Sequence, residues 1–240
     1  MQNYTKTTLT KNLLKKGTGE GLILSEGEEW KMKRRVLTQV FNFDFLKQLA
    51  PEIARMADQV FDKMEQSSGE GMKYDALEAA TELAGNVMID GFFGKGIQVD
   101  RIEGKTVYLY AKEVLEGLTL QRRDPLYFLF GQKFLELGIR KKDREMNRKV
   151  AVYEAWGKGV VEGKIKEIKA KAEKGGLGEK PSNLIEAIVM NSLKAKKEDE
   201  ILYDEQSIFD EFRTFFFAGV DTTSSYLATM IYLVAKHPEV

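Results

Sequence analysis

The chain has 240 residues, 43% of them hydrophobic, so it can bury one large core or two small ones and is not disordered in composition. Its 37 basic and 37 acidic residues balance and its pI is about 6.7, which excludes a global field that would favour nucleic acid or an anionic membrane. It contains no Cys and one His, which excludes disulfides, cysteine-ligated metal sites within these residues and Ser-His-Asp hydrolysis.

Apolar residues recur at three- and four-residue spacing nearly everywhere from residue 26 onward, whereas strand alternation is scarce. This spacing predicts a mainly α protein, and no linker divides residues 1–240 into separate domains. The first 25 residues are polar and rich in Gly, and we expect them to be mostly loop. The predicted helices span 26–41, 44–66, 74–93, 104–121, 143–173, 181–195 and 204–236, with loops at 66–71, 123–125 and 175–181.

The helix at about 204–236 would be about 50 Å long at 1.5 Å per residue, enough to cross a whole domain. Its apolar character on several faces predicts a central helix that neighbours bury. His237 precedes Pro238, so we expect it to mark the end of this helix rather than to act as a catalytic base. No apolar run reaches the roughly 18 to 20 residues of a membrane span, and the N-terminus lacks the apolar core of a signal peptide.

A carboxylic acid and two hydroxyls interrupt the central helix in the run 218–223, which reads Ala-Gly-Val-Asp-Thr-Thr. Gly costs about 1 kcal/mol relative to Ala inside a helix, and Asp and Thr are weak formers, so the run should weaken the helix locally. We expect Gly219 to leave room for a ligand, and Thr222 to hydrogen-bond back to the carbonyl of Ala218 beside the titratable Asp221. The run is typical either of proton delivery to a ligand or of a satisfied buried network without chemistry.

Trp30 and Arg34 are four residues apart in a basic helix, so the indole N–H and the guanidinium share one helix face. Such a pair suits a carboxylate or phosphate, because Arg offers a fork of donors and Trp adds a neutral one. The alternative is a basic amphipathic helix with Trp30 packed inside.

Two motifs in this order resemble the cytochrome P-450 family of haem-thiolate monooxygenases: Gly27-x-x-Trp30-x-x-x-Arg34-Arg35 with Phe41 downstream, then Ala218-Gly219-x-Asp221-Thr222-Thr223 late in the chain. The resemblance implies that the first motif lies in the family's C helix and the second in its long I helix, with 236–239 leading into the J helix. It implies the middle segment of that fold, without the N-terminal strand-rich lobe and the C-terminal haem-thiolate region.

The resemblance also implies a role for each motif. The donors on the first helix would bind a propionate of haem b, and the acid–alcohol pair on the central helix would deliver protons to dioxygen. Small residues beside that pair would flank the oxygen pocket. The implied cofactor-binding residues are Trp30, Arg34, Ala218 and Gly219, and the implied catalytic residues are Asp221 and Thr222.

The partners implied by the resemblance are a lipophilic substrate, dioxygen and a reductase that passes on electrons from NADPH. Lys31, Lys33 and Arg35 are candidates for the basic face that meets the reductase, or else they are simply solvated charges. The segment 126–130 falls where eukaryotic relatives dip a loop into the membrane, although it could equally be core. Relatives of this kind lie on the cytosolic face of the endoplasmic reticulum membrane.

One departure from the family pattern is the absence of Cys, since the family reaction requires a thiolate iron ligand. We therefore expect a partial domain that is inactive alone and exposes apolar surface. Two other functions remain open: a non-catalytic helical binding or scaffold protein, and a lipid carrier that uses a cavity beside the central helix.

Overall fold

The computed structural model describes residues 5–69, 75–194 and 203–239. Within these residues the chain is almost entirely helical, and its one sheet is a hairpin of two-residue strands, β1 (Arg101–Ile102) and β2 (Lys105–Thr106). The mainly α fold predicted from the apolar spacing is confirmed. The helices are α1 (Thr8–Thr18), α2 (Gly27–Leu37), η1 (Thr38–Val40), α3 (Phe43–Gly69), α4 (Ala76–Asn86), η2 (Val87–Phe93), α5 (Val107–Arg122), α6 (Pro125–Glu136), α7 (Lys141–Glu173), α8 (Leu184–Lys194) and α9 (Glu205–Lys236).

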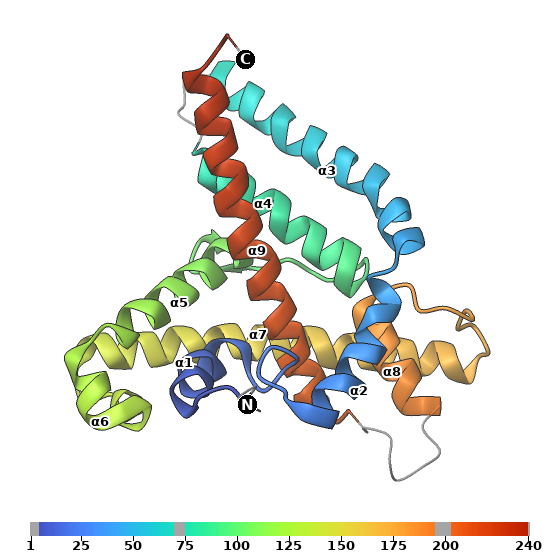
Figure 1. Ribbon diagram of the computed structural model, residues 1–240. Helices are drawn as coiled ribbons and strands as arrows, with labels where there is room; N and C mark the ends of the chain where they lie inside the picture. Colours follow the sequence, from blue (N-terminus) through green and yellow to red (C-terminus); the bar gives the residue numbers. More distant parts are fainter. Residues whose placement is uncertain (1–4, 70–74, 195–202, 240) are drawn as a thin grey trace.

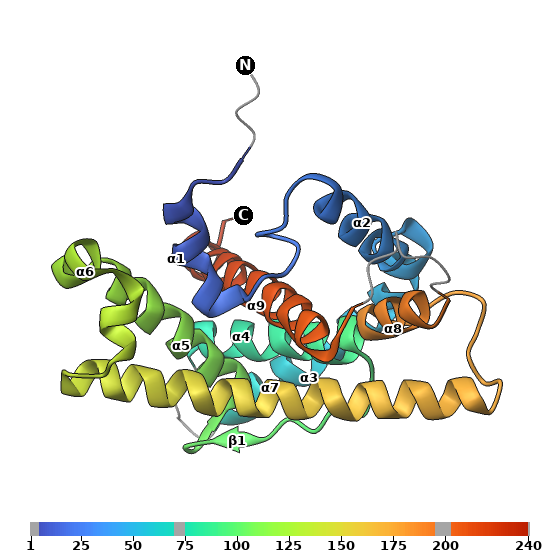
Figure 2. The same ribbon diagram turned by 90° about the horizontal axis from the view of Figure 1, so that it is seen from below.

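The helix predicted at 204–236 is α9, and it runs through the middle of the molecule (Figure 1). Figure 2 shows α9 between α1 and α2 on one side and the long helix α7 on the other. Helix α4 packs extensively along α9, and α5 and α7 also contact it. The prediction of a central helix is therefore confirmed.

Aromatic side chains fill the core around the first half of α9. Phe216 is fully buried, and its ring centroid lies 5.9 Å from that of Trp156 and 6.2 Å from that of Tyr153, both on α7. Tyr108 of α5 and Phe93 of η2 complete the group at 6.3 and 6.5 Å. Because such pairs add about 0.5–1.5 kcal/mol each beyond the burial of their area, this cluster ties three elements to α9.

The polar run 218–223 does not interrupt α9, which is continuous over its whole length. The Thr222 hydroxyl donates a hydrogen bond to the carbonyl oxygen of Ala218 at 2.7 Å, as predicted. This bond gives the Thr222 hydroxyl a hydrogen-bond acceptor within the helix. The poor helix formers of the run therefore do not break α9. The helix ends at Lys236 with His237 as its C-cap, which confirms the predicted boundary.

The expectation that the first 25 residues are mostly loop is wrong, because Thr8–Thr18 form α1. The hydroxyl of Thr7 caps the helix by accepting the N–H of Thr10 at 3.2 Å. Gly19, with φ of 66°, ends it by donating its N–H to the carbonyl of Lys15 at 2.8 Å. Helix α1 packs against α9 and α5, so tertiary contacts stabilise a segment whose own apolar pattern is weak.

Residues 126–130 do not form a loop, because they belong to helix α6. The carboxylate of Asp124 caps this helix by accepting the N–H of Leu126 at 3.0 Å. Pro125 occupies the first helical position, where its missing N–H costs nothing. Tyr127 is buried whereas Leu129 and Phe130 are exposed, so the segment is not uniformly core, and contact of its exposed side with a membrane stays a prediction.

The helix predicted at 104–121 begins three residues later, at Val107, because 101–106 form the hairpin. Glu103 and Gly104 join the two strands with φ of 54° and 79°. Two successive residues with positive φ are what a tight hairpin turn requires, and Gly supplies one of them without strain.

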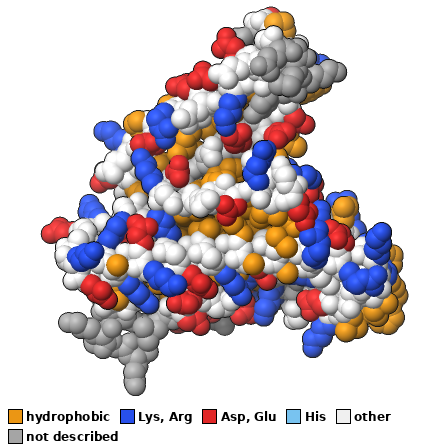
Figure 3. All heavy atoms as spheres, turned by 180° about the vertical axis from the view of Figure 1, so that it is seen from behind, with side chains coloured by type: hydrophobic (Ala, Val, Ile, Leu, Met, Phe, Trp, Pro, Cys, Tyr) orange, Lys and Arg blue, Asp and Glu red, His pale blue; other side chains and the backbone are white. Residues whose placement is uncertain are grey.

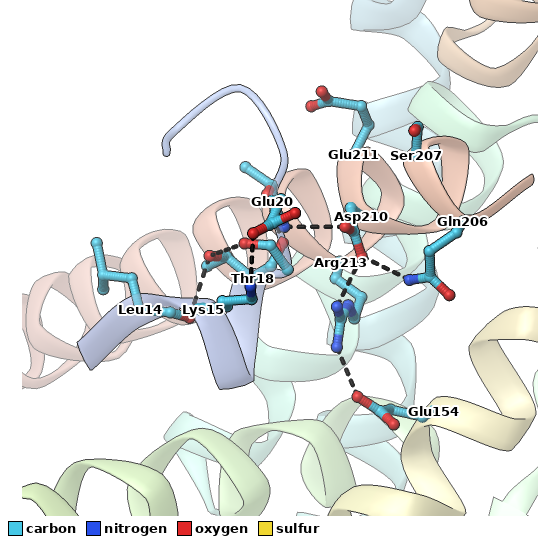
Figure 4. Close-up of polar contacts among 12 residues, drawn as sticks. Leu14, Lys15, Thr18, Glu20, Glu154, Gln206, Ser207, Asp210, Glu211 and Arg213 are labelled. Carbon is cyan, nitrogen blue, oxygen red and sulfur yellow. Dashed lines mark hydrogen bonds and ion pairs between the residues drawn. The ribbon is translucent and has the colours of Figure 1, made fainter. Parts of the chain in front are cut away.

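Buried polar residues of α9 hold the loop that joins α1 to α2. The Asp210 carboxylate accepts the N–H of Glu20 at 2.9 Å, and the Glu211 carboxylate accepts the N–H of Leu22 at 2.8 Å. Figure 4 shows the Asp210 contact and the neighbouring buried guanidinium of Arg213. The first half of α9 therefore carries both an aromatic and a polar anchoring surface.

Arg213 links α9 to α7. Its guanidinium donates to Glu154 of α7 at 2.6 Å and to Asp210 at 2.7 Å (Figure 4). Gln206 donates a further hydrogen bond to Asp210 at 2.9 Å. The buried charges of this region are thus paired, as burial requires.

Two groups of large apolar side chains are exposed on α6 and α9, and single exposed ones, such as Phe43 and Phe61, lie on α3. One group covers α6 and the turn after it, at the lower right of Figure 3: Leu129, Phe130, Leu137 and Ile139. The other follows the second half of α9: Tyr226, Met230, Tyr232, Leu233 and Val234. Exposed apolar groups of this size mark contact surfaces. None of the helices in the described ranges has the length and hydropathy of a membrane span.

We expect Gly85→Ala to lower the free energy of unfolding by about 1–3 kcal/mol through overpacking. A Cβ on Gly85 would overlap the ring of Tyr108, which is buried and held by a 2.8 Å hydrogen bond to Asn86. The matched control is Gly159→Ala inside α7, where no described atom lies within 4 Å of the new Cβ. That change should raise the free energy of unfolding by about 0.5–1 kcal/mol. Denaturant unfolding measures both, and equal effects would contradict the packing argument.

We also expect stability to fall as pH rises from about 4.5 to about 7. Burial raises the pKa of Glu211 from 4.5 to about 7, although Leu22 N–H and Lys33 partly oppose the shift. Between these values the folded chain keeps a proton that the unfolded chain has lost, so ionisation costs up to about 3 kcal/mol of stability. Glu211→Gln should remove this part of the pH dependence in denaturant unfolding at a series of pH values. An unchanged slope would show that Glu211 does not titrate in this window.

Candidate functional site

Trp30 and Arg34 lie side by side on α2, as their spacing predicts. The guanidinium carbon of Arg34 is 5.2 Å from the centroid of the Trp30 ring. Trp30 is 37% exposed, so the alternative in which it packs inside an amphipathic helix is wrong. Within the described ranges no ion pair or side-chain hydrogen bond engages the Arg34 guanidinium. Helix α2 therefore presents a set of free donors to whatever lies against it.

The second half of α9 has an open face. Ala218 and Thr222 are both exposed and lie one turn apart, joined by the hydroxyl–carbonyl bond. Tyr226, one turn further, continues the same exposed face. This face begins where the aromatic core around Phe216 ends, so a small side chain and a hydroxyl mark the boundary between the buried and the open half of the helix.

Asp221 lies on a different side of α9 from Thr222 and belongs to a polar network with α5. Its Oδ1 is 3.2 Å from the Nζ of Lys112, whose side chain is almost fully buried. The same ammonium group lies 3.4 Å from the hydroxyls of Ser224 and Ser225. Both interpretations of the run 218–223 thus describe part of it: Asp221 joins a satisfied network, while Thr222 faces the open surface.

Gly219 does not leave empty space, which corrects the expectation made for it. A Cβ at this position would overlap the side chain of Met88, a buried residue of η2. The glycine therefore lets α9 pack closely on η2, and the room expected for a ligand at its missing side chain is filled. The exposed atoms near the open face are those of Ala218.

The three basic candidates on α2 do not lie alike. Lys31 and Arg35 are exposed, and Lys31 forms an ion pair with Glu28 at 2.6 Å. Lys33 is buried, with its Nζ 2.9 Å from Glu29 and donating to the Glu20 carbonyl at 2.8 Å. The expectation that Lys33 belongs to an exposed basic face is therefore wrong.

The free donors on α2 are of the type that binds carboxylate groups, such as the propionates of haem. The open face of α9 presents a methyl group at Ala218, which allows close approach of a ring. The residues that could hold such a group are Trp30, Arg34 and Ala218, while the 240 residues contain no Cys that could ligate its iron.

Two functional features escaped sequence reasoning. Lys112 pairs with the candidate acid, and its only signal was a lone charge in the apolar stretch Val107–Lys112. Asp210 and Glu211 anchor the loop before α2, although the apolar pattern of the first half of α9 predicts no polar anchor there. A charged residue at a position that the helical period places inside was the available signal in each case.

Comparisons with known proteins agree with the fold. A family model described as cytochrome P450 matches residues 1–240. The chain is 26% identical over 251 residues to cytochrome P450 4A7 of Oryctolagus cuniculus, covering 98% of this chain and 45% of that protein. It is also 26% identical over 235 residues to the ultra-long-chain fatty acid omega-hydroxylase of Homo sapiens, covering 98% of this chain and 43% of that protein.

Among solved structures, the crystal structure of the cytochrome P450DA heme domain superimposes with a TM-score of 0.67 at 19% identity, which shows the fold. The match covers 99% of this chain and 47% of that one. The chain thus spans less than half the length of these relatives. Because the family model covers every residue and the helical fold matches throughout, the chain belongs to the cytochrome P450 family.

Proposed function

We propose that the protein containing these residues is a haem-dependent monooxygenase that inserts one oxygen atom of dioxygen into a lipophilic substrate. The observation that carries the proposal is the free donor pair on α2, Trp30 and Arg34, in a chain that also presents the open face of α9 at Ala218 and Thr222. Membership of the cytochrome P450 family supports the reaction class.

Haem b would be held by two surfaces of this chain. Trp30 would donate its indole N–H and Arg34 its guanidinium N–H groups to propionate oxygens, which charge assistance strengthens. Ala218, with the adjoining backbone of Gly219, would lie against the ring. When bound, haem supplies the reductive activation of dioxygen, which protein side chains cannot perform. The thiolate ligand of the family would come from outside these 240 residues, since they contain no Cys.

Thr222 and Asp221 are proposed as the proton-delivering residues. The Thr222 hydrogen is engaged by the carbonyl of Ala218 at 2.7 Å, so its oxygen lone pairs are free to accept from an ordered water. The Asp221 carboxylate lies 3.2 Å from the Lys112 ammonium group and is half-buried, so it can accept hydrogen bonds both from that group and from water. Because the two side chains lie on different sides of α9, a proton from Asp221 would reach the open face at Thr222 through ordered water.

Partners and location follow from the same proposal. Electrons would come from NADPH through a reductase, with Lys31 and Arg35 as candidate contacts because both are exposed cations on α2. One relative is an ultra-long-chain fatty acid omega-hydroxylase, which supports a lipophilic substrate. The exposed apolar side chains on α6 support a place at the cytosolic face of the endoplasmic reticulum membrane. A charged partner surface predicts association that weakens with salt.

A non-catalytic helical scaffold is the second candidate function, favoured by the absence of Cys. The monooxygenase and the scaffold differ in haem content, because a scaffold at its natural length needs no haem. A purified protein without a haem absorbance band would favour the scaffold. A lipid carrier would instead bind fluorescent fatty acid saturably without haem.

We expect Arg34→Ala to lower the haem content of the full-length protein at least several-fold, since a charge-assisted hydrogen bond contributes about 1.5–3 kcal/mol. Haem absorbance per mole of protein measures the effect. Arg35→Ala is the matched control, because Arg35 is an exposed neighbour that carries the same charge, and its haem content should not change. Equal haem loss in both variants, or in neither, would remove the propionate assignment.

We expect Thr222→Ala in the full-length protein to lower the ratio of product formed to NADPH consumed by about ten-fold or more, because the ordered water that carries the proton would lose its acceptor. Thr229→Ala is the control, because Thr229 also donates to the carbonyl four residues earlier, at 2.8 Å from Ser225, and is exposed on the same helix. If coupling is unchanged in Thr222→Ala, the proton-delivery role is wrong.

A further inference from the structure

The donors proposed for haem and the open face of α9 lie on different helices, so their relative position must be fixed by other groups. Helix α2 packs on α8, and it follows a loop whose backbone is bound to α9. We infer that Glu211 and Lys33 are positioning residues that fix α2, and with it Trp30 and Arg34, against the central helix. The role of this position in holding haem rests on the proposed function. The attachment of α2 and its loop to α9 can be tested separately.

Glu211 and Lys33 meet at the junction of α9, α2 and the intervening loop. The Glu211 Oε2 accepts the N–H of Leu22 at 2.8 Å, while its Oε1 lies 3.5 Å from the Lys33 Nζ. Lys33 in turn donates to the carbonyl of Glu20 at 2.8 Å. The pair therefore connects α9 to α2 both directly and through two backbone groups of the loop.

The surroundings of this pair leave the loop little freedom. Asp210 accepts the N–H of Glu20, and the Thr214 hydroxyl donates to the Thr18 carbonyl at 2.8 Å. A Cβ on Gly21 would lie 2.8 Å from the carbonyl oxygen of Asp210. Because the loop approaches α9 so closely that only glycine fits, a shift of the loop is opposed by both contacts and sterics.

Burial is what makes the pair a positioning device. The side chain of Glu211 is fully buried, and that of Lys33 is 6% exposed. A buried ion pair adds little net stability because desolvation offsets its attraction, but displaced partners leave an uncompensated charge. When Lys33 moves away from Glu211 and the Glu20 carbonyl, its buried ammonium group loses two partners and keeps Glu29, so such a displacement of α2 is opposed. The other titratable groups close to this pair include Tyr203, Asp204, Glu29 and Asp210.

The test compares variants of the protein at its natural length by amide hydrogen exchange and by the rate of haem loss. Glu211→Leu removes the acceptor and the charge, whereas Glu211→Gln keeps an acceptor oxygen for Leu22. Lys33→Met removes the partner charge at similar length. Glu154→Gln is the matched control, because it deletes a carboxylate paired with α9 through Arg213 and does not touch the loop.

We expect Glu211→Leu to speed exchange of the Leu22 amide by about 10- to 100-fold, the effect of losing a hydrogen bond to a charged group. Haem loss should accelerate in Glu211→Leu and Lys33→Met, with partial rescue in Glu211→Gln, and should stay unchanged in Glu154→Gln. The double variant Glu211→Gln with Lys33→Met should be less impaired than the sum of the two single changes.

Two outcomes overturn the inference: exchange in the loop and α2 that is unchanged in Glu211→Leu and Lys33→Met, or haem loss that the control accelerates equally. If the loop is released but haem loss is not faster, while Arg34→Ala does speed it, the positioning role fails and the proposed function stands. If Arg34→Ala also has no effect, the haem assignment fails on its own evidence.

Discussion

The burial of the first half of α9 is the constraint on which the other elements depend. Phe216 is fully enclosed by rings from α7, α5 and η2, so these elements must converge on one turn of one helix. Aromatic rings lose little conformational entropy for the area they bury, which suits a helix that several neighbours share. The second half of the same helix is covered on one side, where Ser224 is fully buried, and its open face begins at Ala218.

The polar residues of this buried half have a different purpose from the aromatic ones. Asp210, Glu211 and Arg213 cost desolvation energy that apolar residues would not, yet each is paired with a backbone group or a charge from another element. Apolar packing would tolerate a small rotation or slide of the loop before α2. Directed hydrogen bonds do not, so these residues define a position rather than increase stability.

Residue spacing predicted most of the fold, because the apolar period gives the long helices directly. It did not reveal α1, whose stability comes from a threonine cap and from contacts with α9, or α6, which an Asp124–Pro125 start could have indicated. Within the site, spacing predicted that Trp30 and Arg34 share a face. It could not predict that Lys33, two residues from exposed neighbours, is buried, because its partner Glu211 is distant in the sequence.

The candidate site combines groups with opposite requirements. Thr222 has to remain open to water and ligand, whereas Asp221, the preceding residue, is turned toward the buried ammonium group of Lys112. Adjacent helical residues point about 100° apart, so one turn of α9 can present a hydroxyl to the open face and a half-buried carboxylate to α5. Gly219 packed on Met88 keeps this turn close to η2. The chemistry of the run therefore depends on how closely α9 packs as much as on the identity of its polar residues.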